Sequence, residues 1–417
     1  MNTAPVGGPA GKKMAIIASY FSGEHYGLLG PQIAATIIEE HTGYECIVIA
    51  VARDDDKALL KIALSEYFGK ERPIIGFSIL SGRPDLFALA NELRNEGADS
   101  PGVLSPGKGG GIIHIPGKAW DENLLKKVNW GNLRRMDHGR LTPHEINTGQ
   151  VLQQIGCPYA SRSRRVEVDY PASLPGKSKV RLLSKGCSFC DVATDKGFYG
   201  ALPEKTVLGQ IRSLPETKEG RKIAFELINE NAPPALPRLL ALAQAEGFQL
   251  SQINLTLRAD WLVKGEPYLK SALRSARGMG IKILVTAVGF ESFDDRILAN
   301  LNKGVTVKTN LEAIRLMRRL KEEFPDAWGY TREEGAVHGF IHPTPWDTPT
   351  TMANTQETIH LYGLQKDILP SHSVPLIIHH ASALGDWIRE IEAREHIRFK
   401  REASIIGWWQ IGDRFTL

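Results

Sequence analysis

The chain has 417 residues, which is too long for one small domain and predicts two or three domains, each with its own core. Its net charge is only +4 at pH 7 and its Lys and Arg residues are scattered, which argues against nucleic acid or an anionic membrane as the main partner. No apolar run could span a bilayer, and the first residues lack the apolar core of a signal peptide, so we expect a cytoplasmic protein.

The first part of the chain alternates strand-like and helical segments. Strands are expected at 14–21, 45–51 and 73–80, helices at 30–41, 56–69 and 85–97, then a Gly-rich turn at 105–117 and a short helix near 121–128. Continuous apolar strands between helices predict a parallel sheet that is covered on both faces. This α/β layout is similar to a flavodoxin-like, doubly wound domain, in which a ligand sits at the carboxyl ends of the strands.

The second part begins after residues 131–175, which are rich in Arg and Pro and are interpreted as an irregular linker. Strands are then expected at 179–184, 222–229, 252–260, 281–291 and 336–343. Helical patterns between them predict βα units in a full or partial barrel, with chemistry at the carboxyl ends of the strands. Polar residues gather at those ends: Glu226, Asn229, Arg258, Asp260, Glu291 and His342. Because polar residues recur at the ends of successive strands, we expect a functional site at this edge.

The four cysteines are too few for a disulfide framework, and Cys187 and Cys190 form a C-x-x-C pair. Thiolates suit zinc, copper(I) or iron–sulfur clusters. Structural zinc usually needs a second Cys or His pair at short spacing, and none follows. A thioredoxin-like dithiol would open a helix, whereas this pair is expected in a loop after the strand at 179–184. Taken alone, the pair indicates metal binding or redox chemistry and does not single out one of them.

The order of several segments resembles that of radical S-adenosylmethionine (SAM) enzymes over roughly Lys179 to Thr350. These segments are GCSFCDVA, VLGQIRSL, FELINEN, LTLRADWL, VGFESFDDRILANLNKG and HGFIHPTPWDT. The flavodoxin-like domain in front makes the whole chain similar to the cobalamin (B12)-binding subclass. The resemblance implies five parts: a disordered tail at 1–12, a cobalamin-binding flavodoxin-like domain at 13–130, the linker at 131–175, a radical SAM partial (β/α) barrel at 176–350 and a short C-terminal extension at 351–417.

The resemblance also implies a [4Fe–4S] cluster that three thiolates hold, with SAM on the remaining iron. The family motif is C-x-x-x-C-x-x-C, but Leu183 stands where its first cysteine would be. Cys157 is our candidate for the third ligand beside Cys187 and Cys190. The rival ligands are a water, a SAM atom, Asp191 and Asp195. Cys46 lies in an apolar strand and is expected to be a core residue.

The family pattern further implies that Glu226 and Asn229 lie near the amino group and methionine part of SAM, although either could merely cap a helix. Arg258 fits a contact to the SAM carboxylate or to a carboxylated substrate, and a structural salt bridge is the alternative. Glu291 would lie near the SAM ribose and methionyl part. His342, with the pair His379 and His380, could contact substrate or serve as an acid, or be structural.

For cobalamin, the candidate contacts are the loop at 19–30, Ser78, and Gly110 in the glycine run at 107–111, because glycine lets the backbone approach a ligand closely. Domains that ligate cobalt through histidine carry D-x-H-x-x-G, which is absent, since Asp137 and His138 are adjacent. The resemblance then implies cobalamin bound without a lower protein ligand. The alternative is a degenerate domain that only shields the barrel.

Together these features predict a cobalamin-dependent radical SAM enzyme, with methyl transfer to an unactivated carbon of a small-molecule substrate through a deoxyadenosyl radical. Its expected partner is an electron donor such as flavodoxin or ferredoxin, with neither nucleic acid nor membrane. One alternative is a radical SAM rearrangement, cyclisation or oxidation without methyl donation from B12. Another is a non-catalytic iron–sulfur or corrinoid carrier. Residues 350–417 name no substrate.

Overall fold

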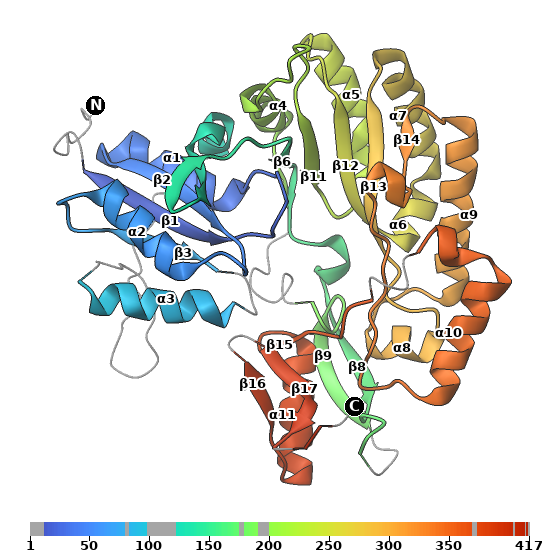
Figure 1. Ribbon diagram of the computed structural model, residues 1–417. Coiled ribbons are helices and arrows are strands. Elements are labelled where there is room, and N and C mark those ends of the chain that lie inside the picture. The colour runs from blue at the N-terminus through green and yellow to red at the C-terminus, as the bar shows by residue number, and fades with distance from the viewer. Residues whose placement is uncertain are drawn as a thin grey trace. The chain divides into compact units, whose positions relative to one another are not determined.

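The protein is described by a computed structural model for residues 12–79, 83–97, 122–174, 179–190, 200–368, 373–402, 405–412 and 414–415. The chain forms two compact units (Figure 1). The first unit is Met1–Val151 with Pro203–Ile223, and the second is Leu152–Leu202 with Ala224–Leu417. Across the described ranges, no helix combines the length and the apolar character that a membrane span needs.

The first unit is built on a five-stranded sheet in the order β3-β1-β2-β4-β5. Its strands are β1 (Lys13–Ser19), β2 (Glu45–Val51), β3 (Ile75–Ser78), β4 (Leu133–Asp137) and β5 (Arg140–Pro143). Its helices are α1 (Leu29–Thr42), α2 (Lys57–Phe68), α3 (Pro84–Asn95) and α4 (Glu204–Ser213), with 3-10 turns η1 (Glu122–Lys127) and η2 (Trp130–Asn132). The first four strands run parallel, and β5 pairs antiparallel with β4. The predicted parallel sheet is confirmed.

Both faces of this sheet are buried, because successive side chains of a strand point to opposite sides. On one face, Ile17 belongs to a core cluster with Leu60 of α2 and Leu86 of α3. On the other face, Cys46 belongs to a cluster with Ala35 of α1. Helices therefore cover both sides, as expected of a doubly wound sheet. Cys46 is fully buried, which confirms it as a core residue, and burial raises the pKa of its thiol to about 12.

Residues 131–175 are not the irregular linker that we expected, because they contain five strands. Besides β4 and β5, these are β6 (Thr148–Leu152), β7 (Gln154–Ile155) and β8 (Ser163–Asp169). The expectation was wrong because the strands are short and half-exposed. In β8, for example, Arg164 and Arg165 are exposed while Val168 is buried, so the apolar signal is weak.

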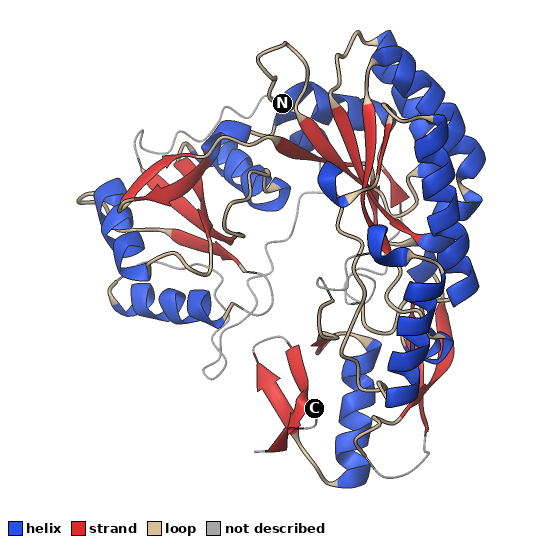
Figure 2. Cartoon of the chain, turned by 45° about the vertical axis from the view of Figure 1, so that its right-hand side comes forward, coloured by secondary structure: helices blue, strands red, loops and turns tan. Residues whose placement is uncertain are grey.

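The second unit contains parallel strands in the order β14-β13-β12-β11, with helices alongside them (Figure 2). The strands are β11 (Ala224–Ile228), β12 (Gln252–Arg258), β13 (Lys282–Gly289) and β14 (Trp328–Gly329). The helices are α5 (Leu236–Ala245), α6 (Ala259–Lys264), α7 (Glu266–Met279), α8 (Asp295–Asn300) and α9 (Val307–Glu323). The mixed α/β class with parallel sheets is thus confirmed for both units.

Two expected strands of this parallel run differ in the structure. The segment at 179–184 lies in β9 (Lys179–Lys185), which pairs antiparallel with β8. Its exposed and buried residues alternate, and this suits a half-exposed ribbon better than a strand buried on both faces. The segment at 336–343 forms only isolated bridges, from Phe340 to Glu291 and from Ile341 to Val374.

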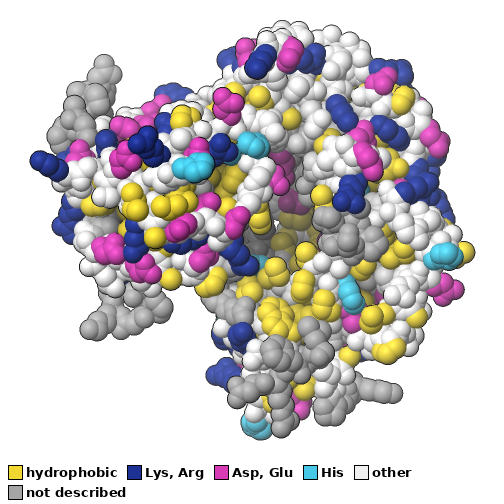
Figure 3. All heavy atoms as spheres, in the orientation of Figure 1, with side chains coloured by type: hydrophobic (Ala, Val, Ile, Leu, Met, Phe, Trp, Pro, Cys, Tyr) yellow, Lys and Arg dark blue, Asp and Glu magenta, His cyan; other side chains and the backbone are white. Residues whose placement is uncertain are grey.

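The C-terminal region adds its own elements to the second unit. They are α10 (Pro349–Leu361), α11 (Ala383–Glu395), β15 (Ile378–His379), β16 (Phe399–Glu402), β17 (Ile405–Ile411) and β18 (Arg414–Phe415). Trp346, Trp387 and Trp408 share one core cluster with Val168 of β8 and Val180 of β9. This region therefore completes a hydrophobic core around the β8–β9 ribbon. On the face in Figure 3, Lys and Arg are interspersed with Asp and Glu over both units.

Candidate functional site

Cys187 and Cys190 lie on a turn directly after β9, in a loop as the sequence predicted. The backbone N–H of Cys190 donates to the Cys187 carbonyl at 3.2 Å and closes the turn. Gly186 precedes the pair with φ of 72°, in the left-handed region that glycine adopts easily. Both cysteines are half-buried and neither forms a disulfide. The two thiols therefore lie on one short, ordered turn.

The turn is held by the end of α8 and the residues that follow it. Ser188 is fully buried; its hydroxyl donates to the Asn300 carbonyl at 2.9 Å and its backbone N–H donates to the Leu301 carbonyl at 2.9 Å. The Asn302 side chain donates to the Gly186 carbonyl at 2.6 Å. Asn300, Leu301 and Asn302 belong to the segment ILANLNKG, the most specific part of the sequence resemblance. That segment fixes the position of the cysteine turn.

Cys157 lies beside this turn, although 29 residues separate it from Cys187 in the sequence. It precedes the 3-10 turn η3 (Pro158–Ala160), and a Cβ at Gly186 would lie 3.0 Å from the Ala160 Cβ, so the two turns are packed together. Burial raises the pKa of the Cys157 thiol, and the charges of Glu230 and Cys187 raise it further. The turns that carry Cys157 and Cys187 are therefore neighbours in the structure.

The structure brings Cys157 and Cys187 into one neighbourhood without assembling a finished metal site. Over the ranges that the structure describes, no group of three or more His, Cys, Asp or Glu side chains is placed to hold a metal ion. Asp191 and Asp195, the rival ligands, lie outside the described residues. The set of Cys187, Cys190 and Cys157 thus stays a prediction. Leu183 is 66% exposed on β9, at the position of the missing family cysteine.

Arg258, at the end of β12, is the first of two buried cations beside Cys187. Its Nη1 donates to the Cys187 Sγ at 3.4 Å and its Nη2 to the Lys303 carbonyl at 2.6 Å. Its Nε donates to Asp260 at 3.0 Å, and its guanidinium lies 4.1 Å from the centre of the Tyr159 ring. Every side of the guanidinium is thus engaged by protein. This is the geometry of the salt bridge that we named as the alternative to a SAM contact.

Lys303 is the second buried cation, and its partner is Glu291. The Lys303 Nζ lies 2.6 Å from Oε1 of Glu291, and Lys303 is only 5% exposed. Burial lowers the pKa of Lys303, but the charges of Glu291 and Cys187 outweigh it and the pKa is raised. Gly289 makes room for the pair, since a Cβ there would lie 2.7 Å from Nζ. We did not single out Lys303 from the sequence, although it lies in ILANLNKG.

Glu226 and Asn229 lie at β11, as expected, with different surroundings. Glu226 is inside the strand and faces Asn254 of β12 in register. Asn229 follows the strand; its Nδ2 donates to Gln153 Oε1 at 2.7 Å, and its Oδ1 accepts the Asn231 N–H at 2.9 Å. The Asn229 side chain is therefore engaged in shaping the turn after β11, close to the capping role named as its alternative.

Glu230 is a carboxylate that the sequence reasoning missed, one residue beyond Asn229. Although its side chain reaches solvent, surrounding protein atoms desolvate the carboxyl and raise its pKa. The cations Lys303 and Arg258 oppose this shift, and Glu226 adds to it. Glu230 therefore shares one electrostatic environment with both buried cations and with Cys157.

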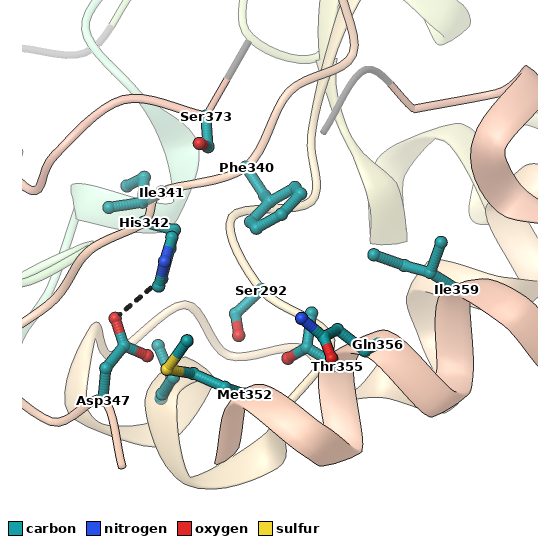
Figure 4. A pocket seen from close by; sticks show the side chains of 11 residues that line it. Ser292, Phe340, Ile341, His342, Asp347, Met352, Thr355, Gln356, Ile359 and Ser373 are labelled. Carbon is teal, nitrogen blue, oxygen red and sulfur yellow. Dashed lines mark hydrogen bonds and ion pairs between the residues drawn. The ribbon is translucent and has the colours of Figure 1, made fainter. Parts of the chain in front are cut away.

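A separate pocket of about 220 Å³ lies at His342 in the second unit (Figure 4). His342 Nδ1 is 3.0 Å from Asp347 Oδ2. Figure 4 shows His342 and Asp347 on one side of the pocket and Gln356 and Ile359 of α10 on the other, with Ser292 and Phe340 between them. The pocket combines an oriented imidazole with an apolar wall, which suits a small and largely neutral molecule. His379 and His380 are not part of its lining.

In the first unit, a pocket of about 210 Å³ lies at the carboxyl ends of β1, β2 and β4. It is lined by Tyr20, Phe21, Ser22, Gly23, Glu24, His25, Ala50, Ala52, Asp54, Asp55, Arg135, Met136 and His144. The loop at 19–30 thus contributes six of the thirteen lining residues, as expected for a ligand at this edge. Ser78 lies exposed at the end of β3, and Gly110 lies outside the described residues.

No family model matches the chain, and no curated protein matches it. Among solved structures, it is similar to the cobalamin-dependent S-adenosylmethionine radical enzyme OxsB with aqua-cobalamin and S-adenosylmethionine bound. The TM-score is 0.54 at 12% identity, over 94% of this chain and 64% of that chain. The apo, selenomethionine-labelled OxsB structure matches with the same TM-score at 11% identity, over 95% and 64%.

The chain therefore spans slightly less than two-thirds of the length of that enzyme. At so low an identity, the likeness concerns the fold, and it extends over both units of this chain. The resemblance drawn from the sequence is confirmed at this level: the chain has the fold of a cobalamin-dependent radical SAM enzyme.

Proposed function

We propose that this chain is a cobalamin-dependent radical SAM enzyme that transfers a methyl group to an unactivated carbon of a small molecule. The observation that supports the proposal most is the gathering of Cys187, Cys157, Arg258 and Lys303 beside residues 297–304. These residues lie in one unit of a chain with the OxsB-like fold.

Cys187, Cys190 and Cys157 are the residues that would hold a [4Fe–4S] cluster. The donor chemistry fits, since thiolates are the usual ligands of such clusters and two buried cations offset their negative charge. When bound, a [4Fe–4S] cluster supplies the electron that cleaves SAM, and cobalamin supplies the methyl group. Residues 176–350 would form the radical SAM barrel of this enzyme.

The surrounding residues orient and tune this site. Tyr159 and Asp260 hold the Arg258 guanidinium so that Nη1 points at the Cys187 sulfur. A hydrogen bond to a ligating sulfur raises the reduction potential of a cluster, so Arg258 would make the cluster easier to reduce. Glu226 and Glu230, which lie close enough for the charge of Glu226 to raise the pKa of Glu230, are the carboxylates proposed to bind the amino group of SAM. A small electron-transfer protein, such as flavodoxin or ferredoxin, is the proposed reductant.

Anaerobic reconstitution with iron and sulfide, followed by incubation with SAM and a chemical reductant, tests the proposal. We expect deoxyadenosine to be released, and release of none would leave only a carrier role. With cobalamin added, we expect S-adenosylhomocysteine as well, because methylation of cobalamin consumes a second SAM. Deoxyadenosine without S-adenosylhomocysteine would favour a rearrangement, cyclisation or oxidation over methyl transfer.

A further inference from the structure

His25 lies in the pocket at the carboxyl ends of β1, β2 and β4, and one of its ring nitrogens is already engaged. Its Nδ1 is 3.2 Å from the backbone carbonyl oxygen of Glu145. A carbonyl can only accept a hydrogen bond, so Nδ1 carries the proton and Nε2 of the neutral ring keeps its lone pair. Histidines that bind metals usually show this arrangement, with the second nitrogen donating to a carbonyl or carboxylate.

The His25 ring is held in place although the residue is exposed. Its backbone carbonyl accepts the Asn147 N–H at 2.7 Å, which ties the loop to the strand region that follows β5. The ring stacks on His144, with 5.1 Å between centroids and 17° between planes. His144 is itself buried and meets Tyr20 edge-on at 5.4 Å. Ordering an exposed side chain costs conformational entropy, which a ligand on Nε2 would offset.

The wall behind His25 also has unused polar capacity. Nδ1 of His144 is buried and makes no hydrogen bond of good geometry among the described residues, but the Glu24 backbone lies close enough to the ring to act as a weak hydrogen-bond partner, and this opposes the lowering of the His144 pKa by burial. Buried polar atoms are nearly always satisfied in a complete structure. What the pocket presents to a bound group is therefore the lone pair on Nε2 of His25, with the buried His144 ring as the wall behind it.

The kind of group follows from the number of available ligands. Within the ranges that the structure describes, no three metal-binding side chains converge, so a bare metal ion would lack ligands here. A corrinoid brings its equatorial nitrogens with it and needs only one axial ligand from the protein. The pocket has a volume of about 210 Å³, which is smaller than the roughly 300–1,000 Å³ of pockets that enclose drug-sized ligands. It therefore suits a corrinoid ring that lies across the opening of the pocket and faces His25 with one axial side of its cobalt.

We propose that Nε2 of His25 is the protein ligand to the lower face of cobalt in a corrinoid bound at this edge of the sheet. The inference rests on the proposed function. It departs from our sequence expectation of no lower protein ligand, which relied on the absent D-x-H-x-x-G motif. The spacing around His25 differs from that motif, with Gly23 two residues before it and Gly27 two residues after it. The contact between His25 and Glu145 is what orients the ring, and no local motif shows it.

Electron paramagnetic resonance of reduced cobinamide bound to the full chain tests the assignment. Cobinamide lacks the nucleotide tail, so any nitrogen splitting on the cobalt signal must come from the protein. We expect each cobalt line of the wild type to be split into a triplet by nitrogen-14, and into a doublet when the protein is labelled with nitrogen-15 histidine. His25→Ala should remove the splitting while cobinamide still binds; His25→Gln serves if the alanine variant does not fold. His138→Ala, at an exposed histidine outside the pocket, should leave the signal unchanged.

The outcomes separate the two proposals. If cobinamide and cobalamin both fail to bind to the folded wild-type chain, the cobalamin function is wrong, and the role of His25 falls with it. If the corrinoid binds but its cobalt signal shows no nitrogen splitting, or if the splitting survives in His25→Ala, the ligand assignment is wrong while the proposed function stands.

Discussion

Replacing Glu291 by Gln should destabilise the second unit through its buried partner Lys303. The Lys303 Nζ and Glu291 Oε1 lie 2.6 Å apart, and the two side chains are only 6% and 16% exposed. The variant leaves a buried ammonium without its counter-charge, and breaking a buried pair in this way costs about 3–5 kcal/mol. Because Glu291 keeps some exposure to solvent, we expect a loss near the lower end, about 3 kcal/mol in the free energy of unfolding.

Urea unfolding, monitored by circular dichroism, measures this loss of stability. A double-mutant cycle with Lys303→Met tests whether the unpaired Lys303 charge causes the loss. The double variant should recover much of the loss, because neither charge is then left buried alone. Glu390→Gln is the matched control, since its 2.7 Å pair with Arg394 is exposed and should contribute at most about 1 kcal/mol. Wild-type stability for Glu291→Gln, combined with weaker SAM binding, would refute the structural pair and assign Glu291 to SAM.

Three further predictions test other parts of the structure. Burial of the Glu334 carboxyl raises its pKa, but hydrogen bonds from two lysines and from backbone N–H groups outweigh this effect and hold the pKa at about 2. The carboxylate therefore contributes its full stabilisation above pH 4.5, and this contribution declines as the pH falls towards 2. Glu334→Gln should flatten the acid dependence of stability measured by urea unfolding. Trp346→Phe should destabilise the protein by about 1 kcal/mol more than Trp387→Phe, which a lower thermal midpoint would show. Of these two tryptophans, only Trp346 has a hydrogen-bond partner for its indole N–H, the Asp169 carbonyl at 2.9 Å. Cys46→Ser should cost about 1–3 kcal/mol in chemical denaturation by burying a hydroxyl in the first core, and it should leave iron content unchanged.

The first sheet could be predicted from the sequence because its strands are buried on both faces. The apolar runs at 45–51 and 14–21 correspond to β2 and β1 within two residues at either end. The ribbon of β8 and β9 could not be predicted in the same way. Its strands show one buried face each, and their partner is a C-terminal core around Trp387 that lies some two hundred residues further along the chain.

The candidate site was predicted in part, for a similar reason. The C-x-x-C pair and the strand-end residue Arg258 carry local signals. Ser188 and Tyr159 do not, because their roles come from contacts across 112 and 143 residues, to the carbonyls of Asn300 and Asn302. Residue spacing can nominate ligands in this way, but it cannot show which side chains hold them in position.

Cluster formation in single cysteine variants tests the central proposal most directly. Cys157, Cys187, Cys190 and Cys46 are each replaced by alanine, and each variant is reconstituted anaerobically with iron and sulfide. Iron content and the electron paramagnetic resonance of the reduced cluster are then compared with SAM cleavage. We predict that Cys157→Ala loses the cluster as completely as Cys187→Ala and Cys190→Ala, while Cys46→Ala keeps it. A full four-iron spectrum and normal SAM cleavage in Cys157→Ala would contradict the three-cysteine site.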